Sequence, residues 1–261
     1  MTRSLELSST ARWWGSTLYQ TTTLELHADG KRLLVDPGVS PWEIAEAMGE
    51  RVDHVLLTHA DWDHVLGVGM SGSAEVVASE AAATRLRDPQ AVDAIVRAAG
   101  KFYVPVHEAQ RLRVDMTIDP PATIELGPWP AVIHAAPGHT DDGIAAWFPT
   151  EHLLVVGDYL SELEIPFVNH SATAYRATLE LLASTISRER PAYVVCGHGR
   201  PHTADRALEI AEEDLGYLTR LIEFAAAGGT SAEADSVTFS RRGVGDAEAH
   251  QANVAHLAAA G

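Results

Sequence analysis

The sequence predicts a mixed α/β fold of the α+β kind, in which short strands fill the first three fifths of the chain and helices follow. The strand segments are short apolar or alternating runs bounded by Gly and Pro, whereas the late segments have helical periodicity. With 261 residues, 46% of them hydrophobic, the chain is long enough for one large core or two small domains. Because no Pro-, Ser- or Gly-rich linker divides it, we expect a single domain over residues 1–261 with C-terminal helices over about 204–261.

The first expected elements form a hairpin. Residues 21–27 alternate as a strand does, Asp29-Gly30 is a tight-turn signal, and residues 32–36 return as a second strand that Pro37-Gly38 stops. Further expected strands are 52–58, 74–78, 122–126, 131–136, 145–148, 153–156 and 193–196. The expected helices are 42–48, most of 79–99, 174–187, 204–226 and 246–259, with a loop over 227–245.

The net charge of the chain limits the kinds of partner that it is expected to bind. There are 36 acidic and 19 basic residues, which give a formal charge of −17. Such a chain repels polyanions on average, so we expect neither nucleic acid nor an anionic membrane surface as a partner. Residues 85–113 are an exception, with six basic and three acidic side chains. We interpret this segment as a solvated helical face, with a local binding patch as the alternative.

Cysteine content and the N-terminal segment bear on location. The one cysteine, Cys196, excludes an intramolecular disulfide and a multi-cysteine zinc site. The segment MTRSLELSST lacks the apolar core and cleavage site of a signal peptide, and no apolar run approaches the roughly 18 residues of a membrane span. We therefore expect a soluble cytoplasmic protein that acts on a small-molecule substrate, with a homo-oligomer left open.

Residues 58–64, THADWDH, gather four side chains of metal-ligand type after an apolar run: His59, Asp61, Asp63 and His64. In an extended backbone that leaves a strand, residues two apart point to the same side, so His59 and Asp61 can hold one cation. Asp63 and His64 begin the next element and can turn toward a second cation. Four ligands in six residues predict a two-metal site, because a closed structural site more often uses cysteines. In the alternative interpretation, Asp63 only caps a helix and Asp61 faces solvent.

Three later segments share one design, in which a buried run is followed by glycine and then by a residue of ligand type. APGHTDDG places His139 in a Pro-Gly turn directly after a strand. LLVVGDYL presents Asp158, a carboxylate that is costly to leave unpaired beside apolar neighbours. YVVCGHGRP sets His198 between two glycines. Each segment is weak evidence alone, but in this order, together with THADWDH, they indicate one site.

With these motifs the sequence resembles the metallo-β-lactamase-fold superfamily, whose metal motif reads His-x-His-x-Asp-His and is followed by a His, an Asp and a last His. The resemblance covers roughly residues 15–205 and includes the hairpin. It implies an αββα four-layer sandwich with the site at one edge of its two sheets. It also implies two divalent metal ions: His59, Asp61 and His139 for the first, Asp63, His64 and His198 for the second, and Asp158 as the bridge between them.

Asp61 departs from the usual motif, because most hydrolases of this superfamily carry histidine there. Four neutral histidines and three aspartates contribute −3, so two divalent ions and a bridging hydroxide give a neutral cluster, where histidine at 61 would leave +1. A less positive cluster is a weaker Lewis acid, and an added hard oxygen ligand favours iron or manganese relative to zinc. We therefore expect Asp61 to be a ligand that tunes the site.

The resemblance implies a dinuclear metal-dependent hydrolase of a small ester, lactone, thioester or phosphodiester. It would act through a metal-bridging hydroxide, with Asp63 or Asp158 orienting the nucleophile. One alternative is a diiron redox enzyme with oxygen or nitric oxide chemistry. Its flavoprotein members carry glutamate at the position of Asp61, but they also carry a flavodoxin domain whose pattern is not found after residue 205. The other alternative is a metal-binding protein without turnover.

For each of the residues beside the motifs, the sequence is consistent with two interpretations. The superfamily's acyl-homoserine lactonases have tyrosine where this chain has Ser161, which argues against a lactone, and Tyr159 can face the site or the core. The segment GDYLSELEIPF either lines the mouth of the site, through Glu162, Glu164 and Phe167, or is a plain connection. Tryptophans either form an apolar wall near the metals or pack in the core, namely Trp13, Trp14 and Trp62.

Overall fold

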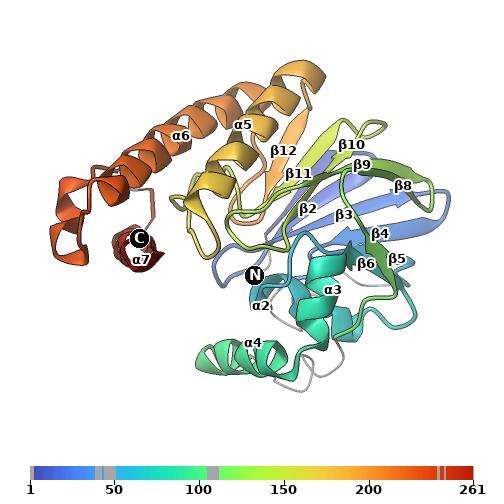
Figure 1. The fold of residues 1–261 in the computed structure, drawn as a ribbon. Helices are drawn as coiled ribbons and strands as arrows, with labels where there is room; N and C mark the ends of the chain where they lie inside the picture. The colour runs from blue at the N-terminus through green and yellow to red at the C-terminus, as the bar shows by residue number, and fades with distance from the viewer. Residues whose placement is uncertain are drawn as a thin grey trace.

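Two sheets lie face to face between two layers of helices in the computed structural model, which describes residues 3–38, 43, 51–104, 112–239, 242–243 and 245–260. In Figure 1, helices α5 and α6 cover the outer face of one sheet, and α2 and α3 cover the outer face of the other, with α4 packed against α2 and α3. The seven-stranded sheet has the order β1-β2-β3-β4-β5-β6-β7, and the five-stranded sheet has the order β12-β11-β10-β9-β8. This arrangement confirms the predicted αββα sandwich.

The strands of the first sheet are β1 (Arg3–Ser8), β2 (Ala11–Gly15), β3 (Thr22–Ala28), β4 (Lys31–Val35), β5 (His54–Leu56), β6 (Glu75–Ser79) and β7 (Met116–Ile118). Those of the second sheet are β8 (Ala122–Leu126), β9 (Trp129–Ala135), β10 (Ile144–Phe148), β11 (Leu153–Gly157) and β12 (Tyr193–Cys196).

The helices are α2 (Trp62–Val65), α3 (Glu80–Arg87), α4 (Pro89–Lys101), α5 (Ala172–Glu189), α6 (Ala204–Ala226) and α7 (Asp246–Ala260), with 3₁₀ turns η1 (Leu66–Met70) and η3 (Ser231–Ser236). None of the described helices is long and apolar enough to span a bilayer. The helix expected over 42–48 lies outside the described residues except for Glu43, which is helical.

Strand alternation divides the apolar side chains among three cores, one for each interface between adjacent layers. In β11, Leu153 and Val155 join the core between the sheets, whereas Leu154 and Val156 join the core under α5 and α6. In the same way Val76 of β6 packs toward the helices on the other side. Because successive side chains of a strand point to opposite faces, a strand buried on both sides reads as a continuous apolar run.

The hairpin and the parallel strands that follow it position the first motif, THADWDH. In the hairpin Ala28 pairs with Lys31, and the turn residues Asp29 and Gly30 both have positive φ, as a two-residue turn of this kind requires. From β4 to β7 the strands run parallel. The C-terminal ends of β4 and β5 therefore lie at the same edge of the sheet.

The structure adds strands that the sequence did not predict, namely β1, β2 and β7. Strand β2 decides the position of two tryptophans, which lie in the sheet rather than beside the metal-ligand cluster. Trp13 is fully buried and its Nε1 donates to Thr22 Oγ1, and Trp14 Nε1 donates to Glu25 Oε2. The segment expected as a plain loop over 227–245 contains η3.

Candidate metal centre

All seven predicted site residues come together at one edge of the two sheets. The motif THADWDH leaves β5, with Asp63 and His64 in the short helix α2. His139 lies in the loop after β9, Asp158 directly follows β11, and His198 lies two residues beyond β12. Each ligand-type residue thus follows the C-terminal end of a strand, as the shared sequence design predicts.

Asp158 lies at the centre of the four histidines. Its Oδ2 lies 3.3 Å from the Nε2 atoms of both His139 and His198, and 3.6 Å from His59 Nε2. Its Oδ1 lies 3.2 Å from His64 Nε2. One carboxylate therefore reaches both halves of the cluster.

The remaining carboxylates divide the histidines into two groups. Asp61 Oδ2 lies 3.2 Å from His139 Nε2, and these two residues form one group with His59. Asp63 Oδ2 lies 3.5 Å from His198 Nε2, and these two form another group with His64. Within each group the candidate ligand atoms all lie within 4.8 Å of one another, a spacing that one cation can span.

The Nδ1 atom of every histidine in the cluster has a polar partner within hydrogen-bond distance. His139 Nδ1 lies 2.8 Å from the carbonyl oxygen of Phe167, and His198 Nδ1 lies 3.1 Å from that of Tyr19. His59 Nδ1 lies 2.9 Å from Thr58 Oγ1. A fixed Nδ1 sets the tautomer and orientation of the ring, so that Nε2 is presented to the centre.

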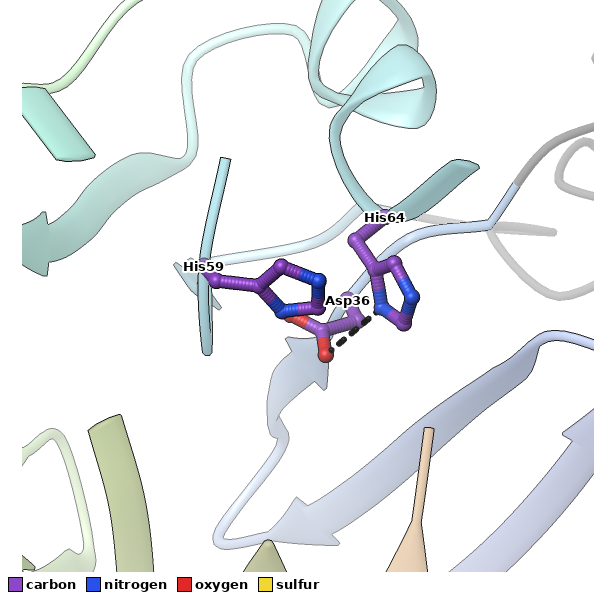
Figure 2. Close-up of side chains that lie close together, drawn as sticks. All are labelled: Asp36, His59 and His64. Carbon is purple, nitrogen blue, oxygen red and sulfur yellow. Dashed lines mark hydrogen bonds and ion pairs between the residues drawn. The ribbon is translucent and has the colours of Figure 1, made fainter. Parts of the chain in front are cut away.

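Asp36, which the sequence analysis treated only as the end of a strand, holds the fourth histidine. Figure 2 shows its carboxylate beside His64, with Oδ2 at 3.1 Å from Nδ1. Thr58 donates to both Asp36 oxygens, through its backbone N–H at 2.7 Å and its hydroxyl at 2.6 Å. Asp36, His59 and His64 could also hold a cation by spacing alone. Because Thr58 and Nδ1 already occupy the carboxylate, we interpret Asp36 as the support of His64.

Arg85, from the basic segment 85–113, belongs to the site. Its Nη2 lies 2.6 Å from Asp61 Oδ1, and its Nη1 lies 3.4 Å from Asp142 Oδ2. Asp142 is buried and also accepts from the backbone N–H of Ala60 at 3.0 Å. For Arg85 the interpretation as part of a solvated face is therefore wrong. The segment's charge excess was the only signal in the sequence.

Three buried polar atoms at the centre form no well-aligned hydrogen bond with a described residue, although the last two lie 3.2 Å apart: His59 Nε2, His64 Nε2 and Asp158 Oδ1. Unpaired buried atoms of this kind are costly, and a bound cation would satisfy them. The close approach depends on Gly197, because a Cβ there would lie 2.0 Å from Asp158 Oδ1. Imidazole nitrogens and carboxylate oxygens are the donors that divalent transition metals use, so the residues fit such ions.

Electrostatic coupling within the cluster shifts the pKa of its members. Burial alone would lower the pKa of His139, but the hydrogen bond that its ring donates to Asp61 and the charge of Asp158 raise it to about 9. Burial likewise opposes the charge of His198, yet Asp158 and Glu164 raise its pKa to about 10. Burial would raise the pKa of Asp158, but the surrounding histidines hold it well below its usual range.

A cavity of about 880 Å³ opens onto this cluster. Trp62, Glu164 and Phe167 line it, as the sequence analysis allowed, whereas Glu162 is not among its described lining residues. Trp62 stacks on Phe102 with ring centroids 5.3 Å apart. The segment GDYLSELEIPF is therefore more than a connection, because it forms one side of the cavity.

Tyr159 and Ser161 support the loops around the cluster. Tyr159 is buried, and its hydroxyl accepts from the His139 backbone N–H at 3.1 Å and donates to the Ala136 carbonyl at 2.9 Å. Ser161 lines the cavity and its hydroxyl donates to the His198 carbonyl at 3.0 Å. Tyr159 thus faces the core and positions the His139 turn.

Comparison with known proteins places this arrangement in a family. The sequence profile of the metallo-beta-lactamase superfamily matches residues 16–198. The chain belongs to this superfamily. Its match therefore includes all seven residues of the cluster and ends at His198.

Individual known proteins differ in their similarity to the chain. A hydroxyacylglutathione hydrolase of Acidiphilium cryptum is 29% identical over 173 residues, which are 65% of this chain and 60% of that protein, so the chain spans less than two thirds of the relative. A metallo-beta-lactamase family protein from Thermus thermophilus has a TM-score of 0.71 at 20% identity, with 97% of this chain and 94% of that chain covered. An inverting sec-alkylsulfatase from a Pseudomonas species also has a TM-score of 0.71, at 11% identity, with 99% of this chain and 50% of that chain covered. These structural similarities show the shared fold.

Proposed function

We propose that the protein is a dinuclear metal-dependent hydrolase. The observation that carries the proposal is the position of Asp158, whose two oxygens lie 3.2–3.6 Å from the Nε2 atoms of four histidines at the base of a cavity. A carboxylate so placed can bridge two cations, with His59, Asp61 and His139 around one and Asp63, His64 and His198 around the other. The membership of the superfamily and the 29% identical hydroxyacylglutathione hydrolase support hydrolysis as the reaction class.

When bound, the two ions would polarise the scissile group and lower the pKa of a water molecule. The residues of the chain supply the geometry. The Nδ1 atoms of the four imidazoles are fixed, so the Nε2 atoms and the carboxylates converge without rearrangement. Because the ligands are already in place, little free energy is spent on ordering them when metal binds. Thr21 Oγ1 lies 3.2 Å from Asp63 Oδ2 and limits the orientation of that carboxylate. Asp63 and Asp158 are the candidates to orient the nucleophile.

The test combines metal analysis with a screen of bond classes. Metal-free protein is reconstituted separately with zinc, manganese and ferrous iron, and the bound metal is measured. Each form is then assayed on p-nitrophenyl esters, a lactone, a thioester and bis(p-nitrophenyl) phosphate. We expect two ions per chain and turnover of at least one bond class that disappears in Asp158→Asn. Absence of turnover on every bond class with every metal would overturn the proposal.

A further inference from the structure

Part of the cavity has apolar walls. Leu160, Leu163, Ile165 and Phe167 line it from the segment after β11. Ala249 and Ala252 of the C-terminal helix α7 belong to the same lining. We call the part of the cavity that these six residues line the acyl chamber. Because α7 lies outside residues 16–198, the α7 residues of this chamber are not part of the segment that the superfamily profile matches.

Most of the charged side chains in the described cavity lining are acidic. Apart from the cluster itself, the lining includes Glu164, Asp214, Asp246 and Glu248, against one basic residue, Arg242. Arg242 is already paired, with Nη1 at 2.6 Å from Asp214 Oδ1 and Nη2 at 2.9 Å from Glu213 Oε2. It also donates to the carbonyls of Ser161 and Glu164. No described lining residue therefore offers a free cation to an anionic ligand.

Glu164 strengthens this bias, because its carboxyl group forms no ion pair or side-chain hydrogen bond with a described residue. A carboxylate on a substrate would have to approach this group without a counter-ion, and like charges repel each other at short range.

We propose that the substrate is an uncharged carboxylic ester whose apolar acyl group fills the acyl chamber, and that acyl groups bearing a carboxylate are rejected. This inference rests on the proposed hydrolase function. Hydrolysis breaks the bond between the acyl carbon and the ester oxygen, and the oxygen of water joins the acyl carbon. One proton of the water goes to the alcohol oxygen, and the other is released to solvent as the acid ionises. The acid product is an anion, so the same acidic lining favours its release.

Matched esters test the two halves of the proposal. On metal-reconstituted protein, kcat/KM is compared for p-nitrophenyl hexanoate, p-nitrophenyl acetate and mono-p-nitrophenyl adipate, which has the same six-carbon chain with a terminal carboxylate. We expect the hexanoate to exceed the adipate at least tenfold, and to exceed the acetate. Glu164→Gln should lower the ratio of hexanoate to adipate about threefold to tenfold, since it removes one repelling charge.

Two substitutions on α7 test the chamber itself. Ala249→Phe would fill it and should lower the ratio of hexanoate to acetate, with Ala249→Leu as a milder variant if the first does not fold. Ala255→Phe is the matched control, because Ala255 is exposed on the same helix and does not line the cavity. Binding of the uncharged analogue N-phenylhexanamide, measured by calorimetry, should weaken in Ala249→Phe and stay unchanged in Ala255→Phe.

The outcomes separate this inference from the proposed function. Hydrolysis of the adipate as fast as the hexanoate, or an unchanged chain-length ratio in both Ala249 variants, would overturn the inference and leave the hydrolase standing. Failure of the reconstituted protein to hydrolyse any of the bond classes would count against the hydrolase itself, and failure of N-phenylhexanamide to bind would then overturn the chamber independently of turnover.

Discussion

Arg85 Nη2 lies 2.6 Å from Asp61 Oδ1, while the other oxygen of Asp61 lies 3.2 Å from His139 Nε2. The two oxygens of this carboxylate therefore have different partners, one cationic side chain and the ring of one candidate ligand. From sequence alone, Asp61 was expected to make the cluster less positive by one charge. The guanidinium restores that charge at close range, so Asp61 and Arg85 together change the net charge little relative to histidine.

The first prediction concerns this pair. Arg85→Met should destabilise the metal-free protein by about 1 kcal/mol, because Asp61 and the buried Asp142 lose a shared cation whose own side chain is partly exposed. Bound metal would supply positive charge to Asp61 in its place. The gain in melting temperature on adding metal should therefore be larger in Arg85→Met than in the wild type.

Thermal melts with and without metal measure this effect. Arg87→Met is the control, since Arg87 is on the same helix and, among the described residues, pairs only with exposed Glu80 at 3.7 Å. Equal metal-induced shifts in Arg85→Met and the wild type would show that Arg85 acts independently of the centre.

Asp158→Asn is the second prediction. The substitution keeps the shape of the side chain but removes the charge that four histidines surround, so the metal-induced gain in melting temperature should fall to less than half of the wild-type gain. The metal content should fall below two ions per chain. Asp205→Asn, at an exposed position on α6, serves as the control. A full complement of two ions in Asp158→Asn would rule out a bridging role.

Stability of the metal-free protein should depend on pH through His139 and His198. Their folded-state pKa values of about 9 and about 10 lie above the unfolded value of about 6.5, so protonation favours the folded state. This contribution is complete below pH of about 6.5 and is lost as the pH rises toward 10. Because protons and metal compete for the same Nε2 atoms, the metal-induced gain should grow over that range.

Melting temperatures at pH 6, 7, 8 and 9, with and without zinc, test this dependence. In His198→Gln the fall between these pH values should be smaller, whereas His170→Gln, at an exposed position, should keep the wild-type slope. A metal-free melting temperature that rises across this interval would contradict the assignment.

Local pattern identified the ligand-type residues at the ends of strands, and it failed where a partner comes from a distant segment. His139, Asp158 and His198 were identified because an apolar run and a glycine precede each of them. Asp36 also comes after an apolar run, but its function depends on contact with His64, 28 residues away, which no local spacing encodes. Arg85 reaches Asp142 across 57 residues.

Tertiary placement explains the errors in the fold as well. Trp13 and Trp14 were candidates for a wall near the metals because β2 was not recognised, and once that strand pairs with β3 their side chains are committed to the sheet. The helix α7 was predicted with nearly its observed bounds. Its position beside the cavity could not be predicted, because amphipathic periodicity indicates that a face is buried without indicating what covers it.

The last prediction is that α7 positions His139 through Asn253. This side chain is fully buried, and its Oδ1 accepts from the Val168 N–H at 2.8 Å while its Nδ2 donates to the Pro166 carbonyl at 2.6 Å. The residue between them, Phe167, gives its carbonyl oxygen to His139 Nδ1 at 2.8 Å. One amide on the C-terminal helix therefore fixes both neighbours of the group that orients a candidate ligand.

Asn253→Ala should lower stability by about 1–3 kcal/mol, because it leaves a buried N–H and a carbonyl unpaired. If the contact orients His139, it should also weaken binding of one of the two metal ions by about tenfold, the lower end of the effect of losing an outer hydrogen-bond partner. Gln251→Ala, exposed on the same helix, controls for helix propensity. Competition with a chelator measures the two affinities at a temperature where both variants are folded. A loss of stability in Asn253→Ala with both metal affinities unchanged would show that Asn253 holds the helix in place but does not position His139.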